Sequence, residues 1–237
     1  MPHFDCAYPA LRTIEPFATT TKPSKPNYTV GFFSSLLDPQ RIHGLVLLGA
    51  PLCFQPGTSG FRDAIASLAP ATLSDTEVVA GTLLSQLSAL ASSQTFIWSR
   101  LLDATLTMAD PSAKDIQGRV ERWTLDEFPL PGRLVFQILQ WLYRENRLCR
   151  GTLPVRHRTI GPSVLRVPTL AVVNTRDDVA PVASVKPFIE AMPVPDVRLV
   201  EYAGPIGVGL QHLAILASSN AYARVWPQIV SCLKARG

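Results

Sequence analysis

The stretch V-P-T-L-A-V-V-N-T-R-D-D, from Val167 to Asp178, decides the fold of this chain. Its apolar, β-branched run predicts a strand that is buried on both faces, which is typical of parallel sheets. The run stops at two aspartates, and ligands of open α/β sheets bind at the carboxyl ends of the strands. The sequence therefore predicts an α/β fold with a candidate acid at this point, and Asp177 is favoured over Asp178 because it comes first.

Strand-like and helix-like segments alternate on both sides of this stretch. The predicted strands are residues 45–48, 167–173 and 197–202. The predicted helices outside the central part of the chain are residues 182–192, 213–217 and 222–235. This alternation indicates a parallel sheet covered by helices, with three recognisable strands.

The central part of the chain has a different character. About a hundred residues separate the first two predicted strands, which is too many for one crossover helix or for a structureless loop. Periodic apolar residues predict helices at 76–90, 95–108, 112–123 and 132–146. We therefore expect a helical cap at residues 53–160, inserted into a core formed by residues 30–52 and 161–237. Residues 1–29 are rich in proline and threonine and are predicted to be irregular.

The composition is that of a globular protein, with 47% hydrophobic and 17% charged residues. The net charge of +4 is mild, and the scattered arginines do not form the dense basic stripe of a nucleic-acid-binding protein. The densest arginine cluster, at residues 144–166, is interpreted as solvated surface. The alternative is contact between these arginines and the phosphates of a coenzyme A thioester.

The cysteines and histidines form no pattern typical of a metal site. The cysteines are Cys6, Cys53, Cys149 and Cys232, without a C-x-x-C pair. We therefore expect no metal, no cofactor and no disulfide, and a reducing cytoplasm as the location. The N-terminus lacks a secretory signal, and no stretch approaches the roughly 20 apolar residues that a transmembrane helix needs.

One histidine stands out by its position after the last predicted strand. His212 follows a glycine-containing loop and opens an apolar segment. A carboxylate can hold a histidine in one tautomer and stabilise its charged form, and the order acid-then-histidine is that of an α/β-hydrolase triad. Asp177 and His212 are therefore candidate catalytic residues. The alternatives are a turn-forming aspartate and a core histidine; His43 and His157 are interpreted as surface residues.

The nucleophile of such a triad should lie on a G-x-S-x-G or G-x-C-x-G turn, and the sequence contains neither. Ser24 is flanked by lysines and prolines, where the strained turn requires small residues. The segment G-T-S-G at 57–60 lacks the residue that the motif places between the serine and the second glycine. Cys6 has no glycine near it. The sequence therefore assigns no nucleophile.

Three segments resemble the polyhydroxyalkanoate synthases, an α/β-hydrolase family. They are D-P-Q-R-I-H-G-L-V-L-L-G-A-P at 38–51, R-W-T-L-D-E-F-P-L-P-G-R-L-V-F-Q-I-L-Q-W-L-Y-R-E-N-R-L at 122–148, and V-P-T-L-A-V-V-N-T-R-D-D-V-A-P at 167–181. The second segment is the most specific, through Trp123, Asp126, Pro131, Gly132, Tyr143, Asn146 and Leu148. The resemblance covers about residues 30–234, and it implies that Asp177 occupies the acid position.

The resemblance implies acyl transfer or hydrolysis on hydroxyacyl-CoA or ester substrates. Active synthases of the family carry a cysteine on a G-x-C-x-G turn, and that turn and the strands before it are missing from this sequence. We therefore expect a truncated, impaired synthase-like enzyme with a partial hydrolase sheet. The alternative is a non-catalytic remnant, or a binding partner of an intact synthase or of a polymer granule.

Overall fold

The computed structural model describes residues 42–72, 77–92, 105, 129–155, 157–204 and 211–235. Among these residues, the main sheet has three parallel strands in the order β1-β6-β7. The strands are β1 (Leu45–Leu48), β6 (Thr169–Asn174) and β7 (Val197–Tyr202). The predicted α/β fold with a parallel sheet is confirmed, and each predicted strand matches an observed one to within two residues.

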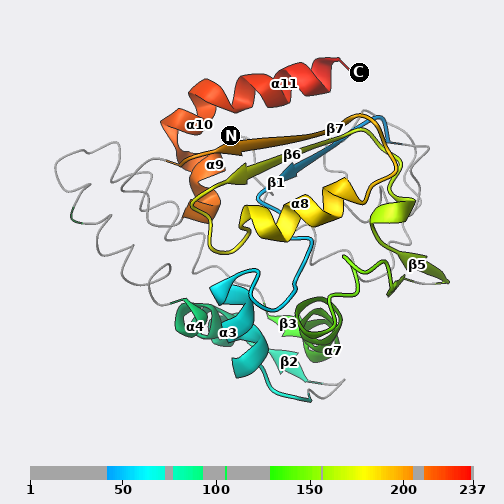
Figure 1. Ribbon diagram of the computed structural model, residues 1–237. Helices are drawn as coiled ribbons and strands as arrows, with labels where there is room; N and C mark the ends of the chain where they lie inside the picture. Colours follow the sequence, from blue (N-terminus) through cyan, green and yellow to red (C-terminus); the bar gives the residue numbers. More distant parts are fainter. Residues whose placement is uncertain are drawn as a thin grey trace, which may run out of the picture.

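The middle strand, β6, is buried along its whole length, as its continuous apolar run predicts. Its side chains alternate between two apolar clusters. Ala171 and Val173 belong to the cluster that includes Phe188 of α8, whereas Leu170 and Val172 belong to the cluster that includes Ile229 of α11. The sheet is therefore covered on both faces, with α8 on one side and α10 and α11 on the other (Figure 1).

The covering helices follow the predicted segments. Helix α8 spans Val182–Glu190, and the closing segment is divided into α9 (Ala214–Ala217), α10 (Ser219–Arg224) and α11 (Trp226–Lys234). The break between α10 and α11 lies at Val225, directly before the first turn of α11, which contains Pro227. Proline fits that first turn because its missing N–H has no partner there.

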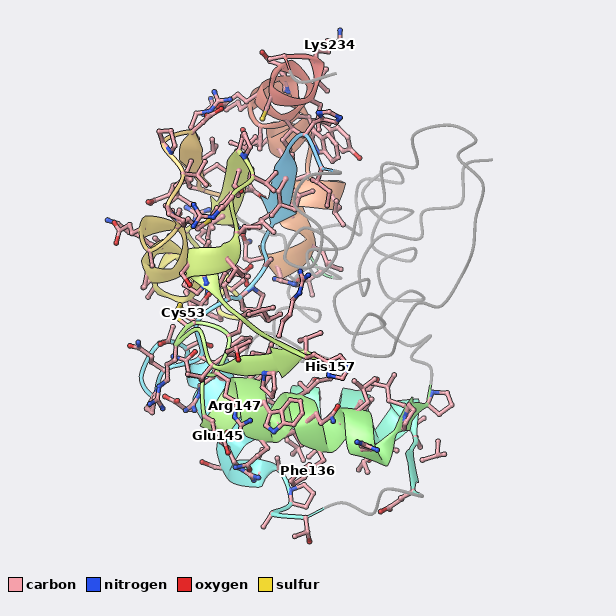
Figure 2. All side chains as sticks on the ribbon, turned by 90° about the vertical axis from the view of Figure 1, so that its right-hand side faces the viewer. Cys53, Phe136, Glu145, Arg147, His157 and Lys234 are labelled. Atoms are coloured by element: carbon pink, nitrogen blue, oxygen red, sulfur yellow. A yellow bond between two sulfur atoms is a disulfide. The ribbon has the colours of Figure 1, made fainter. Side chains whose placement is uncertain are left out.

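Most of the described elements between β1 and β6 lie on the side of α8 that faces away from the sheet (Figure 1). In chain order the elements up to the π-helix are α3 (Gly60–Leu68), β2 (Val78–Val79), α4 (Gly81–Ala91), β3 (Leu130–Pro131), α7 (Gly132–Gln137) and η3 (Ile138–Arg144). The hairpin β4 (Leu153–Val155) and β5 (Arg158–Ile160) and the 3₁₀ turn η4 (Pro162–Val164) lead back to the sheet. Figure 2 shows this layer from the side, with Phe136 at its outer end and Cys53 close to the sheet.

The helices predicted between the first two strands are confirmed in part. The helix expected at 132–146 is present as α7 and η3, but the helix expected at 76–90 begins only at Gly81. The reason is that Val78 and Val79 pair with Pro131 and Leu130 in a short antiparallel ladder. The predicted helices at 112–123, nearly all of the one at 95–108, and residues 1–29 lie outside the described residues.

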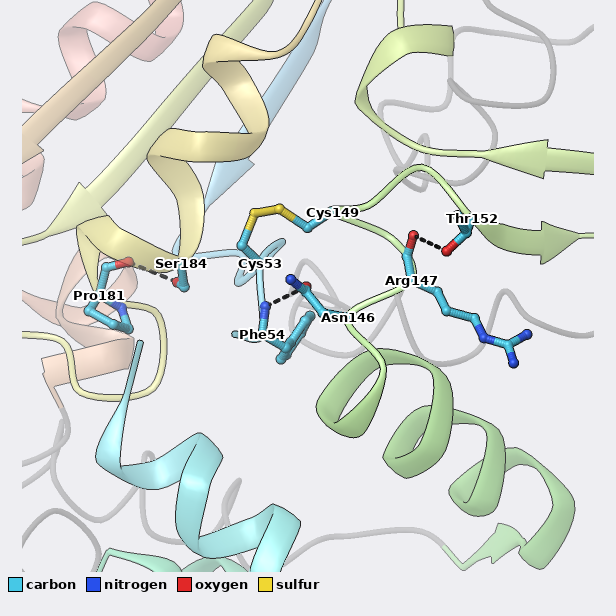
Figure 3. The surroundings of a disulfide bond; sticks show 8 residues. All are labelled: Cys53, Phe54, Asn146, Arg147, Cys149, Thr152, Pro181 and Ser184. Carbon is cyan, nitrogen blue, oxygen red and sulfur yellow. Dashed lines mark hydrogen bonds between the residues drawn. A yellow bond between two sulfur atoms is a disulfide. The ribbon is translucent and has the colours of Figure 1, made fainter. Parts of the chain in front are cut away.

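The expectation of no disulfide is wrong. Cys53 and Cys149 form a disulfide across 96 residues of sequence, with their Cα atoms 4.9 Å apart (Figure 3). Cys53 follows β1, and Cys149 follows η3, where the chain returns toward the sheet. Beside the disulfide, the Phe54 N–H donates to Asn146 Oδ1 at 2.7 Å. The pairing results from this return of the chain, which the sequence spacing does not reveal, and it removes the cysteine-based argument for a reducing compartment.

Within the described residues, none of the helices has the length and apolar character needed to cross a membrane.

Candidate functional site

The structure brings the two candidate residues into direct contact. Asp177 Oδ2 lies 2.7 Å from His212 Nδ1. Asp177 follows β6, and His212 lies in η5 (Gln211–Leu213), after the end of β7. The contact therefore lies at the carboxyl edge of the parallel sheet, where ligands of such sheets bind.

The carboxylate of Asp177 is held independently of the histidine. Its Oδ1 accepts the N–H groups of Val179 at 2.8 Å and Ala180 at 3.1 Å. The Asp177 side chain is 1% exposed, whereas the His212 side chain is 30% exposed. A buried acid in a fixed orientation thus faces a histidine that is open to solvent on another side, which is the arrangement that fixes an imidazole tautomer.

Asp178 has a different position from Asp177. It is exposed, and its carbonyl oxygen accepts the hydroxyl of Ser59 at 2.6 Å. The structure thus places Asp177, the aspartate favoured by the sequence, against His212.

Asn174, the last residue of β6, holds the segment that carries His212. Its Nδ2 donates to the carbonyl oxygen and to Oε1 of Gln211, both at 2.8 Å. Its Oδ1 accepts the N–H of Gly204 at 2.8 Å. A Cβ at Gly204 would lie 2.3 Å from Gln211 Oε1 and 2.6 Å from Asn174 Nδ2, so a larger residue here would displace these two hydrogen-bonded side chains. Sequence reasoning missed Asn174; its signal is a polar side chain at the end of an otherwise apolar strand.

Tyr202, the last residue of β7, adds a phenol near the acid. Burial, and then the negative charge of Asp177, raise the pKa of Tyr202 to about 12. Its hydroxyl is buried and has no hydrogen-bond partner among the described residues. Tyr202 is therefore neutral over the physiological pH range, and its uncharged form is compatible with the adjacent carboxylate.

No nucleophile is paired with His212 in the described parts of the chain, where Asp177 is its one hydrogen-bond partner. Ser59, of the segment G-T-S-G, is engaged elsewhere: its hydroxyl bonds the Asp178 carbonyl oxygen and caps α3. His43 and His157 are exposed, as predicted. The candidate nucleophiles Cys6 and Ser24 lie outside the described residues.

Chemically, the arrangement can move a proton. If Nδ1 carries the ring proton and donates a hydrogen bond to the Asp177 carboxylate, Nε2 has a free lone pair and can act as a base. In the described ranges, no group of three or more His, Cys, Asp or Glu residues could hold a metal ion. A histidine held in this way by a carboxylate has the geometry that general acid–base chemistry needs.

Comparison with known proteins gives two curated relatives, both called poly(3-hydroxyalkanoate) polymerase subunit PhaC. The protein from Haloarcula marismortui is 24% identical over 119 residues, which is 50% of this chain and 24% of that protein. The protein from Haloferax mediterranei is 27% identical over 111 residues, 47% of this chain and 21% of that protein. The match thus spans less than a quarter of the length of each relative.

Two further comparisons complete this result. No protein-family model matches the chain. Among solved structures, a monoacylglycerol lipase from Paleococcus ferrophilus matches with a TM-score of 0.40 and 18% identity, covering 78% of this chain and 61% of the lipase chain. The predicted α/β-hydrolase character agrees with the parallel sheet and with the order of Asp177 and His212 along the chain. Over about half of its length the chain is a partial homologue of PhaC polymerase subunits, which confirms the resemblance to the polyhydroxyalkanoate synthase family.

Proposed function

We propose that the chain performs acyl transfer or hydrolysis on hydroxyacyl-CoA or related ester substrates, with Asp177 and His212 as its acid–base pair. The observation that carries this proposal is the 2.7 Å contact between His212 Nδ1 and a buried carboxylate that backbone N–H groups already hold. In this role Asp177 orients the imidazole and stabilises its charged form, and His212 is the general base.

The proposed steps follow from the two ring nitrogens of His212. Nε2 takes a proton from the attacking group, which is a water molecule or a thiol or hydroxyl from outside the described residues. The attacking atom bonds to the acyl carbon, and the imidazolium then returns the proton to the leaving thiolate or alkoxide. Asp177 stays ionised throughout and stabilises the positive ring.

The substrate class rests on the similarity to the two PhaC subunits, whose name gives 3-hydroxyalkanoate units as what they polymerise. Because the match spans less than a quarter of each relative, the activity of the whole relative is a proposal for this chain. The division into a core at 30–52 and 161–237 and a cap at 53–160 is part of the same proposal. So is a cytoplasmic location, which now lacks the support expected from the cysteines.

The test is coenzyme A release from a 3-hydroxyacyl-CoA by the purified chain. We expect turnover by the wild type and its loss in His212→Ala, by about 10² to 10⁴-fold. His157→Ala is the matched control, because His157 is exposed. Equal rates for wild type and His212→Ala, or no turnover by the wild type with thioesters or esters, contradict the proposal.

A second candidate function is binding without catalysis, to an intact synthase or to a polymer granule. The observation that favours it is that four large apolar side chains between β1 and β3 are exposed, namely Leu68, Val78, Leu83 and Leu90. Exposed apolar side chains mark an association surface where they form a continuous patch. Co-sedimentation with polyester particles, lost on Leu83→Glu and Leu90→Glu, would support this function. A chain that stays in the supernatant and is monodisperse would exclude it.

A further inference from the structure

Ser59 joins two segments that are 119 residues apart in the sequence. Its Oγ donates a hydrogen bond to the carbonyl oxygen of Asp178 at 2.6 Å. Ser59 Oγ also accepts the N–H of Arg62 at 3.1 Å and thereby caps the N-terminus of α3. Helix α3 is the first helix of the proposed cap. Ser59 is 7% exposed, so the two bonds are shielded from water. The Ser59 hydroxyl thus donates a hydrogen bond to the loop that carries Asp177 and accepts one from the first turn of α3.

The bond from Ser59 falls on the peptide group that holds the acid. The carbonyl of Asp178 and the N–H of Val179 belong to one planar peptide unit. That N–H donates to Asp177 Oδ1 at 2.8 Å. Fixing the carbonyl end of the unit therefore fixes the direction of its N–H, and hydrogen bonds at both ends of a peptide polarise one another.

Helix α3 is in turn attached to the rest of the cap. The guanidinium of Arg62, whose side chain is 9% exposed, donates to the carbonyl oxygen of Tyr143 in η3 and pairs with Asp63. Contacts therefore run from η3 through Arg62 to α3, and from Ser59 to the loop of Asp177. This is a continuous set of bonds between the cap and the candidate site.

We propose that Ser59 is a positioning residue through which the first cap helix orients Asp177, and through Asp177 the imidazole of His212. The consequence of this positioning role for catalysis rests on the proposed function, whereas the effect of Ser59 on the loop of Asp177 does not. Ser59 touches neither His212 nor, on this proposal, the substrate, so it acts only through the Asp178–Val179 peptide.

The test is amide hydrogen exchange at Val179 and Ala180, whose N–H groups bond the acid. In Ser59→Ala we expect exchange at Val179 to become about tenfold faster, as for the loss of one hydrogen bond. Ser218→Ala is the matched control. Ser218 caps α10 through Ala221 N at 3.1 Å and is 5% exposed, so this variant loses an equivalent cap away from the acid loop.

Two further variants separate capping from positioning. Ser59→Asp keeps an oxygen that can cap α3 but has no proton for the Asp178 carbonyl, so it should exchange as fast as Ser59→Ala. Ser59→Thr keeps both donor and acceptor and should restore slow exchange. If Ser59→Ala does not fold, the comparison of Ser59→Asp with Ser59→Thr gives the same answer.

Unchanged exchange in both Ser59→Ala and Ser59→Asp overturns the proposal, as does an equal increase in Ser218→Ala. Because exchange is measured without substrate, this result is independent of whether the chain turns over a thioester. Where turnover is found, the proposal also predicts a lower kcat at unchanged KM in Ser59→Asp, because only the orientation of the pair is altered.

Discussion

Gly49, the residue after β1, lies directly against His212. A Cβ built on Gly49 would be 3.5 Å from His212 Cε1 and 3.6 Å from Asp177 Oδ2, and Gly49 has a left-handed φ of +54°. The carboxyl end of β1 thus forms one wall of the acid–histidine pair. Gly49 N also donates to Val172 O at 2.9 Å, which fixes this wall to β6.

Gly49→Ala should reduce the free energy of unfolding by about 1–2 kcal/mol, because a side chain disfavours the left-handed backbone. It should also alter the NMR signals of the His212 ring. Gly151→Ala is the control, since Gly151 has φ +68° and open space where its Cβ would be. We expect the control to lose similar stability and to leave the His212 signals unchanged. Identical ring signals in Gly49→Ala would contradict the described packing.

Asp177→Asn separates the role of this side chain in holding its own loop from its role in setting the tautomer of His212. The asparagine oxygen can still accept the N–H groups of Val179 and Ala180, so the melting temperature should change little. Its amide nitrogen, however, would donate to His212 Nδ1 and place the imidazole proton on Nε2. We expect thioester turnover to fall by roughly 10³ to 10⁴-fold. Nitrogen-15 NMR of the imidazole checks the tautomer, and an unchanged tautomer contradicts the assigned contact.

The Cys53–Cys149 disulfide should contribute strongly to stability. It closes a loop with a sequence separation of 96 residues, and chain-entropy estimates give about 4–5 kcal/mol for a loop of this size. We therefore expect Cys53→Ser/Cys149→Ser to unfold at much lower denaturant concentration than the wild type. A reductant should shift the wild type to the same midpoint. Peptide mapping without reduction must recover the two cysteines in one linked peptide pair; separate free thiols would contradict the structure.

Tyr202 should make stability fall at high pH. Its pKa is raised to about 12 in the folded chain from the ordinary 10.0, so its stabilising contribution is complete below pH 10 and is lost between pH 10 and 12. Because the residue is only half-buried, we expect the loss to be on the order of 1 kcal/mol.

Tyr202→Phe should remove that part of the pH dependence. It should also leave stability at pH 7 unchanged or slightly higher, since a buried hydroxyl without a partner in the described residues is removed. Urea midpoints of both proteins at pH 7 and pH 11 provide the comparison. Parallel losses in the two proteins would exclude Tyr202 as the source.

The sheet and the position of Asp177 were predictable because their signals are local. The run at Leu170–Val173 shows a strand buried on both faces, and Asp177 follows it at the edge where parallel strands end. The order of Asp177 and His212 along the chain then suggests their pairing, although it gives neither the distance nor the tautomer. Catalytic roles for the two residues stay predictions.

The features that the sequence did not reveal depend on proximity in space. Cys53 and Cys149 form their disulfide only because the chain after η3 returns to the segment that follows β1. In the sequence, Ser59 belongs to a segment that does not match the nucleophile turn. Its hydrogen bond to Asp178 forms only when α3 packs beside the loop that carries Asp177. In the same way, the ladder of Val78 and Val79 with β3 replaces the start of a predicted helix. Tertiary contacts override local preference at each of these points.

The most direct test of the central claim is a double-mutant comparison of thioester turnover. The wild type, Asp177→Asn, His212→Ala and the double variant are assayed on one 3-hydroxyacyl-CoA. Residues that act as a unit give strongly non-additive losses, so we expect the double variant to be no slower than His212→Ala. Losses that multiply across the two substitutions, or a wild type without turnover, would contradict an acid–base pair formed by Asp177 and His212.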